Sequence, residues 1–295
     1  MAEREGKALC GLSIRPVCEG DLAFSVQLNK DEGWTDTPED IRRLMRCEPQ
    51  GFLIAELQGR PVGQILSILY GKSGWIGFLI VLQKLRRQGI GLALMRRGIA
   101  YLRDSNVQTI NLEARPEAIG FYEQMGFEAE FKTWKFRCVN KRAGIVDKST
   151  VEAMHNLDLG EVSNFDSSFF PGDRSRVLEG ILADNPDRCY VTRYGGRLRG
   201  YVMCRPTRVG FRIGPLVHDF QAPEAAEALL VSAMNSIPLG ANISLSAPET
   251  DEAGLSFLSK YGFERLTPNV RMFAGEKLDS TRALGILALG GLEKG

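Results

Sequence analysis

The sequence predicts a mixed α/β (α+β) protein in which one structural unit occurs twice. Three observations support this prediction. Between residues 12 and 139, apolar residues first alternate as in strands and then recur at helical spacing. The same order of short motifs returns about 137 residues later. The length of 295 residues also exceeds what one compact core usually supports.

The repeat rests on matches at a nearly constant spacing. LQGRPVG at 57–63 resembles YGGRLRG at 194–200, which gives a shift of 137, and the same shift carries Leu79 onto Leu216. Further along, FYEQMGFE at 121–128 lies over FLSKYGFE at 257–264 with a shift of 136. We therefore expect three parts and a basic linker, VNKRAG at 139–144. The parts are a first domain over 1–140, a second over 147–275 and a C-terminal tail over 276–295.

Each unit is expected to contain a mixed, mostly antiparallel, twisted sheet flanked by helices. Thr37 and Pro38 suit a helix start, because the Thr side chain can cap a helix N-terminus and Pro fits in the first helical turn. The predicted elements of the first unit are a strand at 12–17, helices at 21–29 and 37–47, strands at 51–58, 61–70 and 75–82, a helix at 90–103, a strand at 109–114, a short helix opened by Pro116, and a strand at 127–139.

Composition and charge exclude several classes of partner. Hydrophobic residues make up 44% of the chain and charged residues 25%, and the net charge is only +1. A nearly neutral chain offers no global field for nucleic acid or a membrane surface. The first 11 residues lack the apolar core of a secretory signal, and no run approaches the roughly 18 apolar residues of a membrane span. We expect a cytoplasmic protein with no nucleic-acid or membrane partner, and the oligomeric state stays open.

The cysteines and histidines do not predict a metal site. The six cysteines form no C-x-x-C pair, and neither His155 nor His218 lies near a cysteine pair. We expect no bound metal and reduced thiols. The cysteines are Cys10, Cys18, Cys47, Cys138, Cys189 and Cys204.

The stretch KLRRQGIGLALM at 84–95 predicts a local anion site. It follows the apolar strand at 75–82 and opens an amphipathic helix. Glycines let a ligand approach the backbone, and the first N–H groups of a helix have no internal partner. The helix dipole and two arginines add positive charge, so phosphate is the expected ligand. The pattern lacks the Gly-Lys-Ser/Thr ending of a P-loop and is not a dinucleotide fingerprint.

Two stretches carry a resemblance to a known family. VLQKLRRQGIGLAL at 81–94 resembles the pyrophosphate motif of GCN5-related N-acetyltransferases (GNAT), and PEAIGFYEQMGF at 116–127 resembles a later helix of that family. The resemblance covers residues 12–139. It implies that the protein uses acetyl-CoA as the acyl donor and transfers an acetyl group to a primary amine.

The resemblance also implies roles for individual residues. The backbone of Leu79, Ile80 and Val81 is expected to bind the acetyl and pantetheine portion, and Tyr122 to act as the general acid toward the departing thiolate. Backbone N–H groups of the loop are expected to hold the pyrophosphate. The loop residues assigned to the cofactor are Arg86, Arg87, Gln88, Gly89, Ile90, Gly91 and Leu92.

The sequence departs from the family pattern at several positions. Gln83 and Arg115 stand where the family often has a proline and an asparagine, and the strand at 75–82 carries no acidic residue that could serve as a general base. Glu32, Glu113 and Asp31 are the candidate bases, with a water chain or an amine that arrives neutral as alternatives. Trp34 is a candidate for contacting the acceptor through a cation–π interaction.

The second repeat has lost the cofactor motif. A shift of 137 replaces both loop arginines and both loop glycines, and a shift of 136 replaces Tyr122 by Leu258. This copy is therefore predicted to be a degenerate unit that completes the acceptor pocket or serves as a platform. The shift of 137 pairs Arg86 with Pro223, Arg87 with Glu224, Gly89 with Ala226 and Gly91 with Ala228.

The leading function is transfer of an acetyl group to the primary amine of a small metabolite by direct attack in a ternary complex. A peptide or protein N-terminus is the alternative acceptor. A non-catalytic acyl-CoA sensor would keep the loop at 86–92 but would not need Tyr122, and an interaction scaffold would leave the loop unexplained.

Overall fold

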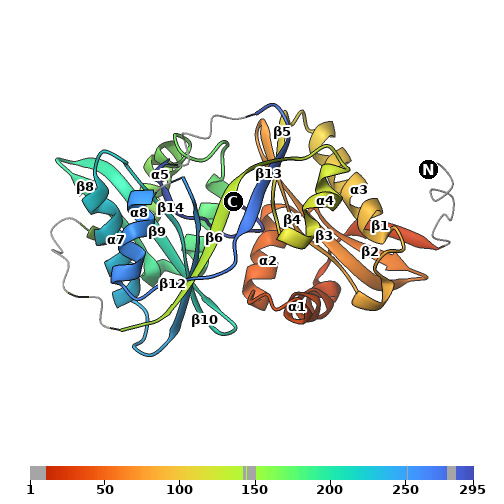
Figure 1. Cartoon of the computed structure of the whole chain (residues 1–295), viewed down its shortest axis with the longest axis horizontal. Helices are drawn as coiled ribbons and strands as arrows, with labels where there is room; N and C mark the ends of the chain where they lie inside the picture. Colours follow the sequence, from red (N-terminus) through yellow and green to blue (C-terminus); the bar gives the residue numbers. More distant parts are fainter. Residues whose placement is uncertain (1–10, 142–143, 145–150, 251, 278–283) are drawn as a thin grey trace. The chain divides into compact units, whose positions relative to one another are not determined.

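The computed structural model describes every residue except 1–10, 142–143, 145–150, 251 and 278–283, and it divides the chain into two compact units. The first unit is Met1–Ile110 and the second is Asn111–Gly295 (Figure 1). The start of the sequence, part of the expected linker and part of the expected tail lie outside the described residues.

The first unit contains a four-stranded antiparallel sheet in the order β1-β2-β3-β4. Its helices cover opposite faces of β3. Gln64 donates a hydrogen bond to Asn29 of α1 at 2.7 Å, whereas an added Cβ at the neighbouring Gly63 would lie 3.2 Å from Leu94 of α3. The elements are β1 (Leu12–Pro16), α1 (Leu22–Asp31), α2 (Pro38–Cys47), β2 (Phe52–Leu57), β3 (Arg60–Tyr70), β4 (Ser73–Val81) and α3 (Ile90–Asp104).

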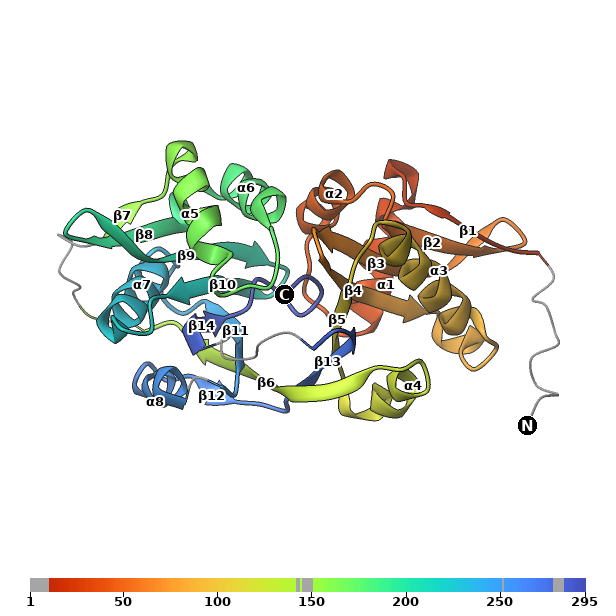
Figure 2. The same ribbon diagram turned by 90° about the horizontal axis from the view of Figure 1, so that it is seen from above.

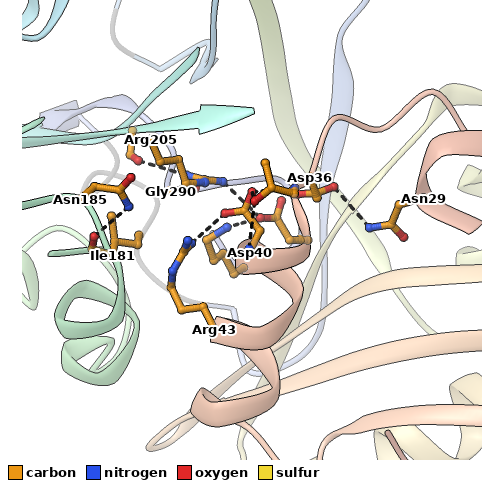
Figure 3. A network of polar contacts seen from close by, with 12 residues as sticks. Asn29, Asp36, Asp40, Arg43, Ile181, Asn185, Arg205 and Gly290 are labelled. Carbon is orange, nitrogen blue, oxygen red and sulfur yellow. Dashed lines mark hydrogen bonds and ion pairs between the residues drawn. The ribbon is translucent and has the colours of Figure 1, made fainter. Parts of the chain in front are cut away.

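Local sequence explains the helical pair α1 and α2. Thr37 caps α2 as predicted, because its hydroxyl accepts a hydrogen bond from the Asp40 N–H at 3.1 Å and Asp40 bonds back to the Thr37 N–H at 3.0 Å. Asn29, near the end of α1, donates to Asp36 at 3.4 Å (Figure 3). These bonds fix the turn between the two helices.

The second unit contains the strand order β5-β13-β6-β11-β10-β9-β8-β7, with β12 paired to β6 and β14 paired to β10 (Figure 2). Its elements are β5 (Thr109–Ala114), which begins at the end of the first unit, α4 (Ile119–Glu123), β6 (Glu128–Val139), β7 (Val151–Ala153), α5 (Leu159–Asp166), α6 (Ser175–Asp184), β8 (Cys189–Tyr194), β9 (Arg197–Thr207), β10 (Gly210–His218), α7 (Pro223–Asn235), β11 (Asn242–Pro248), α8 (Glu252–Lys260), β12 (Glu264–Arg265), β13 (Asn269–Gly275) and β14 (Ile286–Ala288).

This sheet combines strands from both sequence repeats. β6 comes from the first repeat, yet it pairs with β11 from Val139↔Asn242 to Thr133↔Pro248. β13 comes from the second repeat and lies between β5 and β6. The boundary between the compact units at residue 110 therefore differs from the expected domain boundary at residue 140, and the division into 1–140, 147–275 and 276–295 stays a proposal about the repeats.

The element bounds confirm the repeat over its central strands. β3 and β9 have the same length and start at Arg60 and Arg197, and β4 and β10 start at Ser73 and Gly210. Both pairs are related by the shift of 137.

The shift falls to 135 in the following helices. Leu94 of α3 and Leu229 of α7 each lie against a glycine of the central strand, Gly63 and Gly200 respectively. The pairings of loop residues by a shift of 137 were therefore wrong by two positions. With a shift of 135, Arg86 corresponds to Gln221, Arg87 to Ala222, Gly89 to Glu224 and Gly91 to Ala226. The loss of both arginines and both glycines stands.

The last described residues form part of the second unit. β14 pairs with β10, and Ile286, Leu287, Ala288 and Leu289 are all buried. The apolar stretch LGILALGG, which was expected in a tail, thus contributes to a core. Among the described residues, none of the helices combines the length and the apolarity that crossing a membrane requires.

Asn140 provides a test of how firmly β6 belongs to the second unit. Its buried side-chain amide donates to Met234 at 3.0 Å and to Ile237 at 2.8 Å. Asn140→Ala would remove this donor from the Ile237 carbonyl and one of the donors from the Met234 carbonyl, which also accepts the Ile237 N–H at 3.1 Å. We therefore expect a loss of about 1–3 kcal/mol in the free energy of unfolding, measured with urea. Asn242→Ala, at an exposed asparagine of the same sheet, is the control. Equal effects of the two substitutions would contradict the anchoring role.

Candidate active site

The loop between β4 and α3 has the backbone geometry of an anion site. Arg87 and Gly89 both have left-handed backbones, with φ of +63° and +90°, and Gly89 caps α3. The first intrahelical bond runs from the Ala93 N–H to the Gly89 carbonyl at 3.0 Å, so the preceding N–H groups have no carbonyl one turn earlier in the helix. A Cβ added at Gly91 would meet only Val81 at 3.8 Å, which leaves the space at this helix end open.

A β-bulge interrupts β4 where the residues assigned to the acyl portion begin. Gln64 pairs with Ile80 and Leu66 pairs with Gly77, so β4 contains one more residue than β3 across this step. Phe78 lies within the bulge and has a φ of +50°, which is a costly value for a bulky residue. A bulge turns backbone groups away from the regular ladder.

Trp34 supports this bulge directly. Its ring stacks on Phe78 with the centroids 5.4 Å apart and an interplanar angle of 27°, and Phe78 also contacts Phe52 with centroids 6.0 Å apart. The position assigned to acceptor binding by sequence therefore has a packing role in the structure. Contact of Trp34 with an acceptor stays a prediction.

Arg86 is connected to both the strand and α1. Its Nε donates to the Val81 carbonyl at 3.0 Å, and its guanidinium pairs with the carboxylate of Glu32. The Arg86 side chain is 42% exposed, so the pair is worth at most about 1 kcal/mol. The ion pair orients Arg86 beside the loop, and it engages Glu32, which makes Glu32 a weaker candidate for the base than Glu113.

Glu113 of β5 combines burial with an incomplete set of hydrogen bonds. Its Oε1 accepts a bond from Thr133 of β6 at 2.8 Å. Its Oε2 is buried and accepts no hydrogen bond from the described residues. Burial raises the pKa of Glu113 to about 7, although Arg271 of β13 and the Thr133 bond oppose this rise. The carboxyl group is therefore poised to exchange a proton near neutral pH.

Three strands thus meet at Glu113, and they belong to both repeats. Arg271, Thr133 and Lys135 lower the pKa of Glu113, whereas Glu130 raises it. Arg271 lies 4.0 Å from the Glu130 carboxylate, and its guanidinium lies 5.8 Å from the centroid of Phe131. The charge state of Glu113 is therefore set in part by β13, which comes from the second repeat.

Tyr122 of α4 lies among aromatic rings, 5.3 Å from Phe121 and 6.0 Å from Phe127 between centroids. Burial raises the pKa of Tyr122 to about 12, with Arg115 opposing the shift. The hydroxyl keeps its proton at neutral pH. A thiolate of ordinary pKa near 8.5 is a weaker base than this phenolate, so full proton transfer would cost about 5 kcal/mol, and hydrogen-bond donation to the sulfur is favoured.

The histidines, cysteines and acidic residues that the structure describes do not form a metal site. Within the described ranges, no three His, Cys, Asp or Glu side chains lie close enough to hold a metal ion. Of the cysteines in those ranges, Cys18 is exposed and the others are buried as free thiols, while Cys10 falls in the undescribed segment 1–10. Burial raises the pKa of Cys204 to about 12, which makes that thiol a poor nucleophile.

Comparison with protein families places both repeats in one group. The model of the acetyltransferase (GNAT) family matches residues 22–127, and a model of an acetyltransferase (GNAT) domain matches residues 162–284. Holothin acyltransferase from Pseudoalteromonas sp. is 25% identical over 248 residues, which cover 83% of this chain and 82% of that protein. An acetyltransferase of Pectobacterium atrosepticum is 33% identical over 98 residues, which cover 32% of this chain and 70% of that protein.

A solved structure supports the whole fold. A crystal structure from Pyrococcus horikoshii, assigned as an acetyltransferase, superposes with a TM-score of 0.82 at 24% identity and covers 97% of this chain and 96% of that chain. The loop, the bulge and the two family matches together define a tandem GNAT protein. The chain belongs to the GNAT acetyltransferase family and is an acyltransferase enzyme.

Substitutions of two glycines in the loop test two different properties, the backbone strain at Gly89 and the space for a ligand at Gly91. Gly89→Ala forces a side chain into a left-handed backbone, so we expect a loss of about 1–2 kcal/mol in the free energy of unfolding. Gly91→Ala adds a methyl group in open space within a helix, so stability should hold or rise by up to about 1 kcal/mol while acetyl-CoA binding weakens. Urea unfolding and calorimetric titration measure the two effects. A Gly91→Ala variant with unchanged acetyl-CoA affinity would show that no ligand approaches this position.

Proposed function

We propose that the protein is an acetyl-CoA-dependent N-acetyltransferase that acts on the primary amine of a small metabolite. The observation that carries the proposal is the loop 86–92, in which left-handed Arg87 and Gly89 present an open helix N-terminus after a bulged strand. Such a terminus suits a pyrophosphate, which distinguishes a CoA thioester from uncharged acyl donors. The cytoplasmic location expected from the sequence is part of the same proposal.

We assign donor binding to backbone groups and to Arg86, whose side chain is oriented by Val81 and Glu32. We assign the N–H groups from Arg87 to Leu92 to the pyrophosphate, with Arg86 beside them. Leu79 lies in the bulge and Ile80 and Val81 follow it, and we assign all three to the acetyl and pantetheine portion. Backbone N–H groups at this place would polarise the thioester carbonyl as negative charge develops on its oxygen.

The chemical step is a direct attack. The amine nitrogen forms a bond to the thioester carbon, the carbon–sulfur bond breaks, and CoA leaves as a thiolate. Glu113 is our choice for the group that takes the amine proton, because its buried Oε2 has acceptor capacity to spare and its pKa is raised to about 7. Tyr122 donates a hydrogen bond to the departing sulfur.

The acceptor is the least constrained part of the proposal. One relative takes its name from an acceptor, holothin, and others are named only as acetyltransferases. A peptide or protein N-terminus stays the alternative acceptor, and an acyl-CoA sensor stays the alternative to catalysis. The buried carboxyl of Glu113 favours catalysis, because binding a CoA thioester does not require a proton acceptor.

Thiol release tests the reaction. Purified protein is incubated with acetyl-CoA and a library of primary amines, amino acids and short peptides, and free CoA thiol is measured. We expect release that depends on a small amine, with Tyr122→Phe slowing turnover about 10–100-fold at unchanged acetyl-CoA affinity. Acetyl-CoA binding without turnover of any acceptor would favour the sensor, and absence of acetyl-CoA binding would reject the donor assignment.

The pH dependence tests Glu113. Activity should fall as the pH drops below about 7, because the carboxylate then takes up a proton, and Glu113→Gln should lose most activity at every pH. The raised pKa also means that the folded protein binds this proton more tightly than the unfolded chain. The free energy of unfolding therefore decreases as the pH rises from about 4.5 to 7. Glu113→Gln removes this decline, and its stability relative to the wild type should rise by about 1–3 kcal/mol from pH 5 to pH 8.

Glu264→Gln, at an exposed position of β12, is the matched control for these measurements. It should change neither the pH profile of activity nor the pH dependence of unfolding. A Glu113→Gln variant that behaves like this control would remove Glu113 from the mechanism.

A further inference from the structure

The second repeat contains a place where two neighbouring strands separate. β10 and β11 are parallel and pair only at Phe211↔Ile243 and Arg212↔Ser244. Beyond these pairs β14 lies between them, because Leu216 pairs with Ala288 and the Leu289 N–H donates to the Ser246 carbonyl at 2.8 Å (Figure 2). The backbone of the segment 284–295 therefore forms hydrogen bonds with both of the separated strands, β10 and β11.

The occupied edge corresponds to the acyl-donor edge of the first repeat. The shift of 137, confirmed by the bounds of β4 and β10, carries Leu79 and Ile80 onto Leu216 and Val217, the two residues that pair with β14. β10 also has a bulge at nearly the same place, between Ile213 and Leu216. In the first repeat we assign these positions to the acetyl and pantetheine portion. In the second repeat the chain's own backbone takes them.

We propose that the segment 284–295 is the resident ligand of the second repeat's former acyl-donor groove, which it fills as an added strand. This assignment rests on the proposed function only for the identity of the donor in the first repeat. The groove is thus a peptide-binding edge whose occupant is encoded in the same chain.

The segment packs closely against its neighbours at two glycines. A Cβ added at Gly214, within the bulge, would lie 2.1 Å from the Leu289 carbonyl oxygen. A Cβ at Gly285 would lie 2.5 Å from the His218 carbonyl oxygen of β10 and 2.3 Å from the ring of Phe169. Glycine is required at both positions because the two backbones approach so closely.

Two buried arginines hold the segment at its far end. Arg205 of β9 donates to the Gly290 carbonyl at 2.8 Å (Figure 3) and lies 3.5 Å from the Glu293 carboxylate. Arg174 donates to the Gly295 carbonyl at 2.9 Å while its Nε bonds to Asp166 at 2.7 Å. Burial raises the pKa of Glu293, but Lys294, Arg205 and Arg212 outweigh it and hold that pKa below its usual range.

The arginine of β9 is specific to the second repeat. The shift of 137 relates Arg205 to Ile68, a buried apolar residue of β3. Burying an arginine is costly, and the segment offsets part of this cost because it supplies the Gly290 carbonyl as an acceptor and the Glu293 carboxylate as a counter-charge. The second repeat thus differs from the first in two ways that both fit a filled groove. It lacks the arginines and glycines of the cofactor loop, and it has a buried arginine that contacts the segment 284–295.

Hydrogen–deuterium exchange on the full chain tests the assignment, with and without saturating acetyl-CoA. We expect the amides of 286–290 to be protected as strongly as those of β10 and β11, and this protection to be the same with acetyl-CoA present. Peptides covering 86–92 should gain protection on addition of acetyl-CoA. Rapid exchange at 286–290, or a loss of protection there on adding acetyl-CoA, would overturn the proposal. No change at 86–92 would instead reject the proposed donor site and leave this inference standing.

Arg205→Met provides a matched perturbation. It removes the guanidinium while keeping an unbranched apolar stem, so exchange across 286–295 should accelerate at least tenfold while peptides covering 86–92 keep their response to acetyl-CoA. Arg137→Met, at an arginine of β6 that is 65% exposed, is the control and should leave 286–295 unchanged. Equal exchange in the two variants would contradict the anchoring role of Arg205.

Discussion

The structure depends on how backbone N–H and C=O groups find hydrogen-bond partners where two neighbouring strands separate and no longer pair with each other. Buried N–H and C=O groups must find partners, so an edge of this kind needs an occupant. In the second repeat the occupant is β14, held between β10 and β11 by strand pairing and by Arg205. In the first repeat the corresponding residues follow Phe78 in the bulged strand, and we propose that acetyl-CoA is the occupant. In this proposal the same architecture holds a ligand in one repeat and a segment of the chain in the other.

The proposed base Glu113 is surrounded by strands of both repeats. β6 and β13 lie beside one another although they come from different repeats, and Thr133 and Arg271 on these strands act on Glu113 of β5. The second repeat therefore contributes to the environment of the proposed base even though it has lost the cofactor loop. Removal of the second repeat would remove β13, the strand beside β5 and Glu113.

Much of the fold could be predicted from the sequence, because alternation and helical spacing are local signals. The strands at 61–70 and 75–82 and the cap at Thr37 were predicted this way and are confirmed. The partners of β6 could not be predicted, since pairing between distant strands leaves no local pattern. The role of LGILALGG at 284–291 could not be predicted either, because it depends on the edge offered by β10. Glu113 was a candidate by residue type, but its burial depends on three strands that only the structure brings together.

The central claim is that the chain has two copies of one groove and that only the first is open to a CoA thioester. Calorimetric titration of the full chain with acetyl-CoA tests this most directly, because it counts the sites that are open at equilibrium. The account predicts one acetyl-CoA per chain. A stoichiometry of two would contradict the closure of the second groove by residues 284–295, and the absence of binding would contradict the donor site at 86–92.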